Sequence, residues 1–152
     1  MPVELSEAAR ELVIAEAQRV AERVDDERAK ALYGRVAREA EAGALDDELL
    51  TALGNLLELG FAGGRIRARH GAHAEMAATS LYRLTPQGQA LHAQFAEATK
   101  ALAALSGQTL ERITLAARGP GMVSLSIETT EANLAIAFDA KGVQVRSVEV
   151  GA

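Results

Sequence analysis

The chain has 152 residues, of which 49% are hydrophobic and 24% charged, and its formal net charge is -5. This length and balance are typical of one compact domain, or of a domain with a small appended lobe, and they exclude a disordered tail. No apolar run approaches the roughly 18 residues of a membrane-spanning helix, and the N-terminus lacks the basic and apolar regions of a signal peptide. Because the sequence has no cysteine, disulfides and thiolate chemistry are excluded. We therefore predict a cytoplasmic protein without membrane contact.

Charge and residue type both change along the chain. Residues 1–60 hold seven Lys/Arg against fourteen Asp/Glu, a net of -7, whereas residues 61–110 hold five against two, a net of +3. An acidic N-terminal half argues against wrapping the whole protein around nucleic acid, but it leaves room for one basic contact. The final 42 residues contain eight of the fifteen Val and Ile. This shift predicts a helical domain over residues 1–106 and a small β-sheet lobe over 107–152.

The first sixty residues have the apolar periodicity of three amphipathic helices. Ser6 and Asp26 are expected to cap the first two helices, and Gly43 and Gly60 to end the second and third. Gly54 lies inside the third helix, where glycine costs up to about 1 kcal/mol relative to alanine, and this predicts a close approach by a neighbouring element. The predicted helices cover residues 7–24, 27–42 and 46–58.

The periodicity changes after Phe61. Three arginines alternate with Ile66 and Ala68, a pattern that is typical of a β-strand with one arginine face. Residues 79–84 are the expected returning strand, so a β-hairpin is predicted over residues 62–84. A capping Thr85 followed by Pro86 then predicts a helix over residues 86–105.

The rest of the chain alternates apolar and polar residues, which predicts a four-stranded antiparallel meander with one apolar face. Turns are expected at residues 119–121 and 139–142, and an irregular step at Arg146–Ser147 predicts a bulge. The predicted fold class is α+β: a helical body with a β-hairpin, followed by a small C-terminal antiparallel β-meander.

Two motifs border the predicted hairpin. The first is Leu56-Leu57-Glu58-Leu59-Gly60-Phe61, a leucine-rich helix end closing on glycine and an aromatic residue. The second is Leu84-Thr85-Pro86-Gln87-Gly88-Gln89-Ala90-Leu91, in which threonine caps the helix and glycine allows close packing. Both motifs resemble the winged-helix regulators of the MarR and PadR type, and the second is similar to the helix start after the wing in that family. The resemblance covers residues 7–105 and implies a recognition helix at 46–58 and a wing at 62–84.

The expected recognition helix departs from the DNA-binding pattern, because it begins Asp46-Asp47-Glu48 and contains no Lys or Arg. We therefore expect a non-enzymatic, dimeric regulatory or assembly module that acts through protein–protein contacts. Side chains two residues apart on a strand point the same way, so the hairpin would present a basic surface to an acidic partner protein or another anion. The residues of that anion- or partner-binding surface are Arg65, Arg67, Arg69 and Arg83.

The alternative hypothesis is a DNA-binding transcriptional regulator of the winged-helix type, which would contact DNA mainly through its basic wing. In that case Thr51 and Asn55 are the polar residues that could read bases. The expected homodimer interface is formed by the 86–105 helix and the first helix, and the C-terminal sheet either packs on the body or extends the dimer.

Chemistry-bearing motifs are otherwise sparse. His70, His73 and Glu75 are weak candidates for metal ligands, since they lie close in sequence but have no fourth ligand nearby. The sequence has no Gly-x-Ser-x-Gly elbow, phosphate loop or dinucleotide fingerprint. Accordingly, no catalytic residue, metal or cofactor is predicted.

Overall fold

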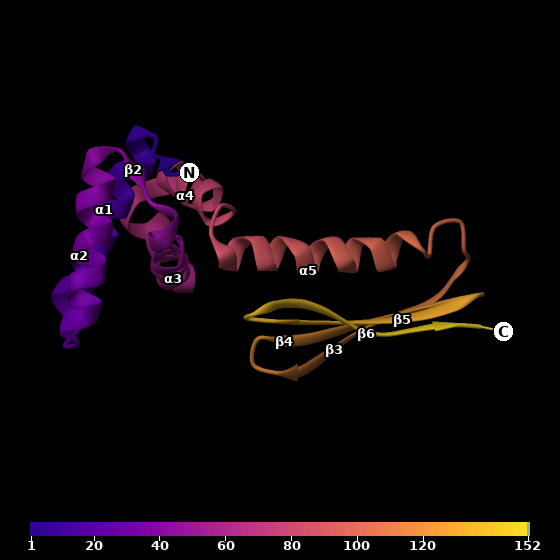
Figure 1. Cartoon of the computed structure of the whole chain (residues 1–152). Helices are drawn as coiled ribbons and strands as arrows, with labels where there is room; N and C mark the ends of the chain where they lie inside the picture. Colours follow the sequence, from indigo (N-terminus) through magenta and orange to yellow (C-terminus); the bar gives the residue numbers. More distant parts are fainter. Residues whose placement is uncertain (152) are drawn as a thin grey trace. The chain divides into compact units, whose positions relative to one another are not determined.

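The computed structural model describes residues 1–151 (Figure 1). Helices occupy the first two thirds of the chain, and a four-stranded antiparallel sheet follows, so the predicted α+β class is confirmed. The chain divides into two compact units, Met1–Gln89 and a second unit that starts at Ala90. The change in composition near Ser106–Gly107 falls between the last helix and the first strand of the sheet.

The N-terminal unit begins with two helices whose ends match the predicted caps. The Oγ of Ser6 accepts a hydrogen bond from the Ala9 amide at 3.3 Å, and an Asp26 carboxylate oxygen accepts from the Arg28 and Ala29 amides at 2.7 and 2.9 Å. Gly43 ends the second helix in the left-handed region, at φ 93°. The unit consists of α1 (Glu7–Arg23), α2 (Glu27–Ala42), α3 (Leu50–Phe61) and α4 (Arg65–Tyr82), with the short 3-10 turns η1 (Asp47–Leu49) and η2 (Ala62–Gly64) and the paired strands β1 (Val3–Glu4) and β2 (Ala44–Leu45).

The core of this unit is formed by the apolar stripes of its four helices. It includes the apolar stripe of α1 expected at a dimer interface, since Leu12, Val13 and Ala17 are buried within the unit itself. Burial of large side chains is the main stabilising contribution here, at about 25 cal/mol per Å² of apolar surface. The largest buried side chains are Leu12, Val13, Val36, Leu45, Leu49, Leu53, Leu56, Leu57 and Ile66.

The predicted β-hairpin over residues 62–84 is wrong, because the segment forms η2 and the helix α4, which is interrupted at Gly71 (φ 87°, ψ 176°). Alternation of Arg65, Arg67 and Arg69 with apolar residues looked like a strand over five residues. Over the whole segment, however, the buried and half-buried residues follow a helical period, and alanine and arginine have high helix propensity. That longer stripe consists of Ile66, His70, Ala74, Ala78 and Leu81. The wing implied by the family resemblance is therefore absent.

Gly60 also has a different role from the predicted one. It lies inside α3, which ends at Phe61, and the glycines with positive φ directly after this helix are Gly63 and Gly64. A Cβ on Gly60 would lie 2.7 Å from the Ile66 side chain, so the glycine lets α3 and α4 pack closely. The third helix also starts later than predicted, since residues 47–49 form a 3-10 turn.

The helix α5 (Pro86–Ala103) starts as the sequence predicts. The Thr85 Oγ accepts a hydrogen bond from the Gly88 amide at 3.1 Å. A Cβ on Gly88 would overlap the carbonyl oxygen of Tyr82, which explains why glycine occupies this first turn. The close approach predicted at Gly54 is confirmed as well, because the side chain of Gln87 occupies the space of a Cβ there.

The C-terminal unit contains the predicted meander, with strand order β3-β4-β5-β6. The predicted bulge is confirmed: Ile136 pairs with Val145 and Ala135 with Ser147, so Arg146 has no opposite residue. A small core between α5 and the sheet is centred on Ala98, Leu134, Ile136 and Val143. The strands are β3 (Leu110–Gly119), β4 (Met122–Thr129), β5 (Ala132–Asp139) and β6 (Gly142–Val150).

Candidate functional site

The four arginines expected on one face of a strand do not form one surface. Arg65 and Arg69 are one helical turn apart on α4, whereas Arg67 points to a different side because successive residues turn by about 100°. The Arg67 side chain lies 3.6 Å from the Glu75 carboxylate. Arg83 is exposed and directly follows α4, and within residues 1–151 Arg65 makes no ion pair.

Arg69 instead belongs to a partly buried ionic cluster around Glu16 of α1. Glu16 is 4% exposed, and its carboxylate lies 3.2 Å from the Arg69 guanidinium and 2.7 Å from the Nε2 of His70. Burial raises the pKa of Glu16, but the hydrogen bond with His70 and the charges of Arg19 and Arg69 together lower it by more than burial raises it. The pKa of Glu16 is therefore below its ordinary value. These contacts join α1 to α4, and they engage both carboxylate oxygens of Glu16.

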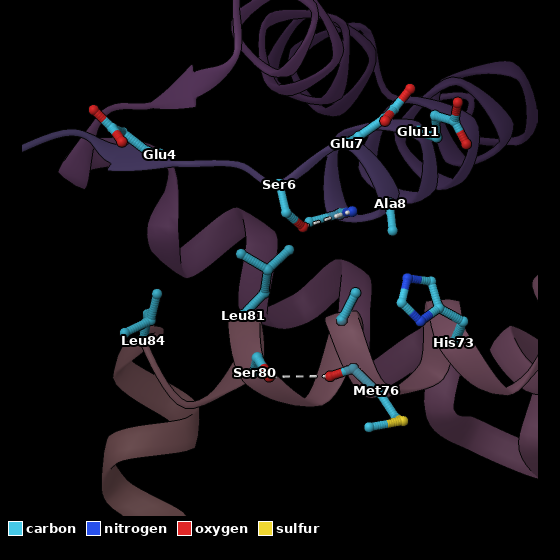
Figure 2. A pocket seen from close by; sticks show the side chains of 12 residues that line it. Glu4, Ser6, Glu7, Ala8, Glu11, His73, Met76, Ser80, Leu81 and Leu84 are labelled. Atoms are coloured by element: carbon cyan, nitrogen blue, oxygen red, sulfur yellow. Dashed lines mark hydrogen bonds between the residues drawn. The ribbon is translucent and has the colours of Figure 1, made fainter.

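The three weak metal candidates all lie on α4 and have separate environments. His70 bonds to Glu16, and Glu75 faces Arg67. His73 is directed toward the start of α1, beneath Ala8 (Figure 2). Within the described residues 1–151, no three His, Cys, Asp or Glu side chains gather as a metal site would require.

A groove of about 780 Å³ runs between the N-terminal turn of α1 and α4 (Figure 2). The side opposite α1 is mainly apolar, with Met76 and Leu81 of α4 and Leu84 in the turn after it. The carboxylates of Glu7 and Glu11 point away from α4, and Ser80 donates its hydroxyl hydrogen to the Met76 carbonyl. The groove thus lacks the converging polar groups that orient a substrate for chemistry.

The two residues considered for base reading lie one turn apart on the exposed side of α3. Both are tied to the start of α5, because the Gln87 amide donates to the Thr51 carbonyl at 2.9 Å and to the Asn55 side-chain oxygen at 2.8 Å. The side-chain oxygen of Asn55 is therefore already engaged. Helix α3 contains no Lys or Arg, and residues 65–82 form a helix in place of a wing, so neither element places basic side chains beside Thr51 and Asn55 to bind phosphates.

The feature that stands out lies in the C-terminal unit: one side of its sheet is only partly covered. Leu115, Leu125, Ile136 and Val145 are paired across the four strands in one row, and burial changes along it. Ile136 on β5 is 1% exposed, whereas Leu115 on β3 is 70% exposed. In the next row Leu134 on β5 is 2% exposed, and the residues on the two outer strands are both exposed, Ile113 on β3 at 55% and Val148 on β6 at 51%.

Simple dimensions explain this gradient. Four strands spaced by about 4.8 Å span about 19 Å. A helix with its side chains is about 10 Å wide and covers roughly two strands. The contacts of α5 centre on β5 and on the start of β6, where Gln94 accepts a hydrogen bond from the Val143 amide at 3.2 Å. The apolar side of β3 and the Val123 end of β4 are therefore left exposed, whereas Leu125 and Ile127 of β4 pack against the core under α5.

The flank of α5 that borders this region is apolar too. Leu91, Gln94, Ala98, Ala101 and Leu105 form the half-buried and buried stripe that contacts the sheet. Glu97, Lys100 and Ala104 lie to one side of the stripe, next to residues of β6. From the helical period, Phe95 and Leu102 lie on the opposite side, toward β4 and β3, and both are exposed.

We call this surface the open face. It carries no charged side chain, because the charged residues paired in β3 and β4, such as Arg112 and Glu128, lie on the other side of the sheet. The alternation of apolar residues predicts that the strand residues of the open face point inward, but it does not predict that they lack a covering element. The presence of only one predicted helix next to four strands does indicate that part of the sheet stays exposed. The open face comprises Phe95 and Leu102 of α5, Leu110, Ile113 and Leu115 of β3, and Val123 of β4.

Comparison with known proteins gives no further assignment, since no family model, curated protein or solved structure matches the chain. The resemblance to winged-helix regulators is neither supported nor refuted by these comparisons. Among the described residues, none of the helices combines the length and the apolar character that are needed to cross a membrane.

Proposed function

We propose that the protein is a non-enzymatic assembly module that acts through protein–protein contacts, with the open face as its contact surface. The observation that carries this proposal is the exposure of Leu115 and Ile113 in the same rows as the fully buried Ile136 and Leu134. Each large apolar side chain left in water forgoes roughly 1.5–3 kcal/mol of burial free energy. A continuous apolar patch of this kind is typical of an interaction site.

The geometry favours this function over the alternative of DNA binding. The DNA hypothesis needs a basic wing, and residues 62–84 form helix α4 instead. It also needs a basic or neutral recognition helix, whereas the segment before α3 begins with three acidic residues. A regulatory role through protein contacts stays within the proposal.

Site-specific photo-crosslinking tests the proposed surface. A benzophenone amino acid is placed at Leu115, on the open face, or at the neighbouring Thr114, on the other side of the same strand. In cells that produce the chain, irradiation is expected to give a discrete protein adduct from position 115 and little from position 114. The adduct is expected to disappear when Ile113→Arg is added. Equal adducts from both positions, or none from position 115, would contradict the proposal.

A further inference from the structure

We infer that the open face is covered by a second copy of this chain, packed face to face about a two-fold axis. This inference rests on the proposed function and adds the identity and geometry of the partner. In a two-fold arrangement the same patch of both chains meets itself, so each side must be self-complementary. The open face meets that condition because it is apolar and without charge, so two copies bring no like charges together.

The size of the patch matches what a dimer needs. The exposed fractions of the six residues of the open face amount to about three whole large side chains. Five of the six are aliphatic, so the lower end of the aromatic range, roughly 150 Å² for each, applies, and this is roughly 450 Å² of apolar surface per chain. A standard interface buries about 800 Å² per partner, and about 65% of a homodimer interface is apolar. The apolar area of the open face is therefore similar to the apolar area that each chain buries in a standard homodimer interface.

The space beside α5 has the right depth for a sheet. A helix and a sheet each form one layer when they pack on a sheet, and two packed sheets lie about 10 Å apart. Because α5 occupies this layer over β5 and the start of β6, the vacant part over β3 and the Val123 end of β4 accepts the β3–β4 side of a second copy. Phe95 and Leu102, on the flank of α5 that faces the vacant part, would then contact the partner's edge strand.

Pairing of two sheets edge to edge explains the structure less well. A strand added beside β3 would hydrogen-bond to the unpaired backbone groups of β3, but it would leave the side chains of Ile113 and Leu115 exposed to water. The other edge is unsuited to pairing, because β6 is bulged at Arg146 and its Val143 amide already bonds to Gln94. Face-to-face packing covers the strand residues and the α5 flank together.

Sedimentation equilibrium of the purified chain over a range of concentrations tests the partner. The expected species has twice the 16.0 kDa mass of the chain. Leu115→Arg is expected to weaken dimerisation by at least roughly thirtyfold, as for an interface hot spot, whereas Thr114→Arg on the other side of the strand changes it little. Phe95→Glu, on α5, is a second variant with the same expected loss. Circular dichroism shows that each variant is folded.

Cysteine cross-linking tests the geometry, and it is clean because the native chain has no cysteine. With a short bis-maleimide, Leu115→Cys is expected to give a covalent dimer and Thr114→Cys is not. Cross-linking from both positions would indicate edge pairing, and preferential cross-linking from Thr114→Cys would indicate packing on the other side of the sheet. Either result would overturn the inference, as would a dimer that persists in both Leu115→Arg and Phe95→Glu. A purified chain that is monomeric at all concentrations would also overturn it. In that case an adduct from position 115 to a different protein would leave the proposed function standing.

Discussion

Single glycines set how closely segments approach in the N-terminal unit. A Cβ on Gly88 would overlap the backbone carbonyl of Tyr82, whereas a Cβ on Gly34 in α2 would meet nothing within 4 Å. Gly88→Ala is therefore expected to lower the free energy of unfolding by about 2 kcal/mol, because backbone must shift. Gly34→Ala is expected to raise it by about 0.5–1 kcal/mol through helix propensity. Urea unfolding measures both, and equal effects of the two substitutions would contradict the packing described at Gly88.

The buried carboxylate of Glu16 is expected to contribute to the stability of the fold. Glu16→Gln is expected to lower the free energy of unfolding at pH 7 by about 1–3 kcal/mol, because Arg69 and His70 lose their charged acceptor. The matched control is Glu22→Gln, on the exposed part of α1, with little expected change.

The sign of the pH dependence follows from the lowered pKa of Glu16. A carboxylate whose pKa is lower in the folded than in the unfolded chain stabilises the fold fully above about pH 5. This contribution is lost as the pH falls through the folded-state pKa, which lies below the ordinary value of 4.5. The stability difference between the wild type and Glu16→Gln, measured by urea unfolding, is thus expected to shrink on acidification. A difference that is constant from pH 7 to pH 3 would be inconsistent with the ionic cluster.

At the scale of elements, the arginines distinguish a helix from a strand at residues 65–69. In the helix, Arg69 reaches Glu16, whereas Arg65 makes no ion pair among the described residues. Arg69→Ala is therefore expected to destabilise the fold by about 1 kcal/mol, since a charge-assisted bond at a partly exposed site is lost. Arg65→Ala is expected to change the free energy of unfolding by less than about 0.5 kcal/mol. Similar effects of the two substitutions in thermal unfolding would favour a strand, on which both arginines lie on the same face.

Local capping and turn residues made most elements predictable. Ser6, Asp26, Gly43 and Thr85 act through bonds to their own neighbours, and their roles follow from the residues nearby. The segment 62–84 was not predicted correctly because its decisive contacts are distant in sequence: Arg69 and His70 of α4 bond to Glu16 of α1. An alternation over five residues does not distinguish a strand from a helix here, whereas the spacing of the buried and half-buried residues from Ile66 to Leu81 indicates a helix.

On the scale of the whole molecule, the candidate surface depends on an imbalance between elements. Strand periodicity predicts which side of the meander is apolar, and that side is correct. It does not show how much of the side α5 covers, because this depends on where the helix lies over the sheet. The predicted arginine surface was wrong because it depended on the secondary structure of one short segment, residues 65–69, which is helical.

If the open face is buried by protein in solution, its methyl groups are shielded from a soluble paramagnetic agent, and methyl NMR measures that shielding. The methyl groups of Leu115 and Thr114 lie on neighbouring residues but on opposite sides of β3. At concentrations where the chain is dimeric, we expect the Leu115 methyls to be protected from the agent and the Thr114 methyl to be fully relaxed by it. Leu115 methyls that stay as accessible as that of Thr114 at every concentration, alone and in cell extract, would show that no protein covers the open face.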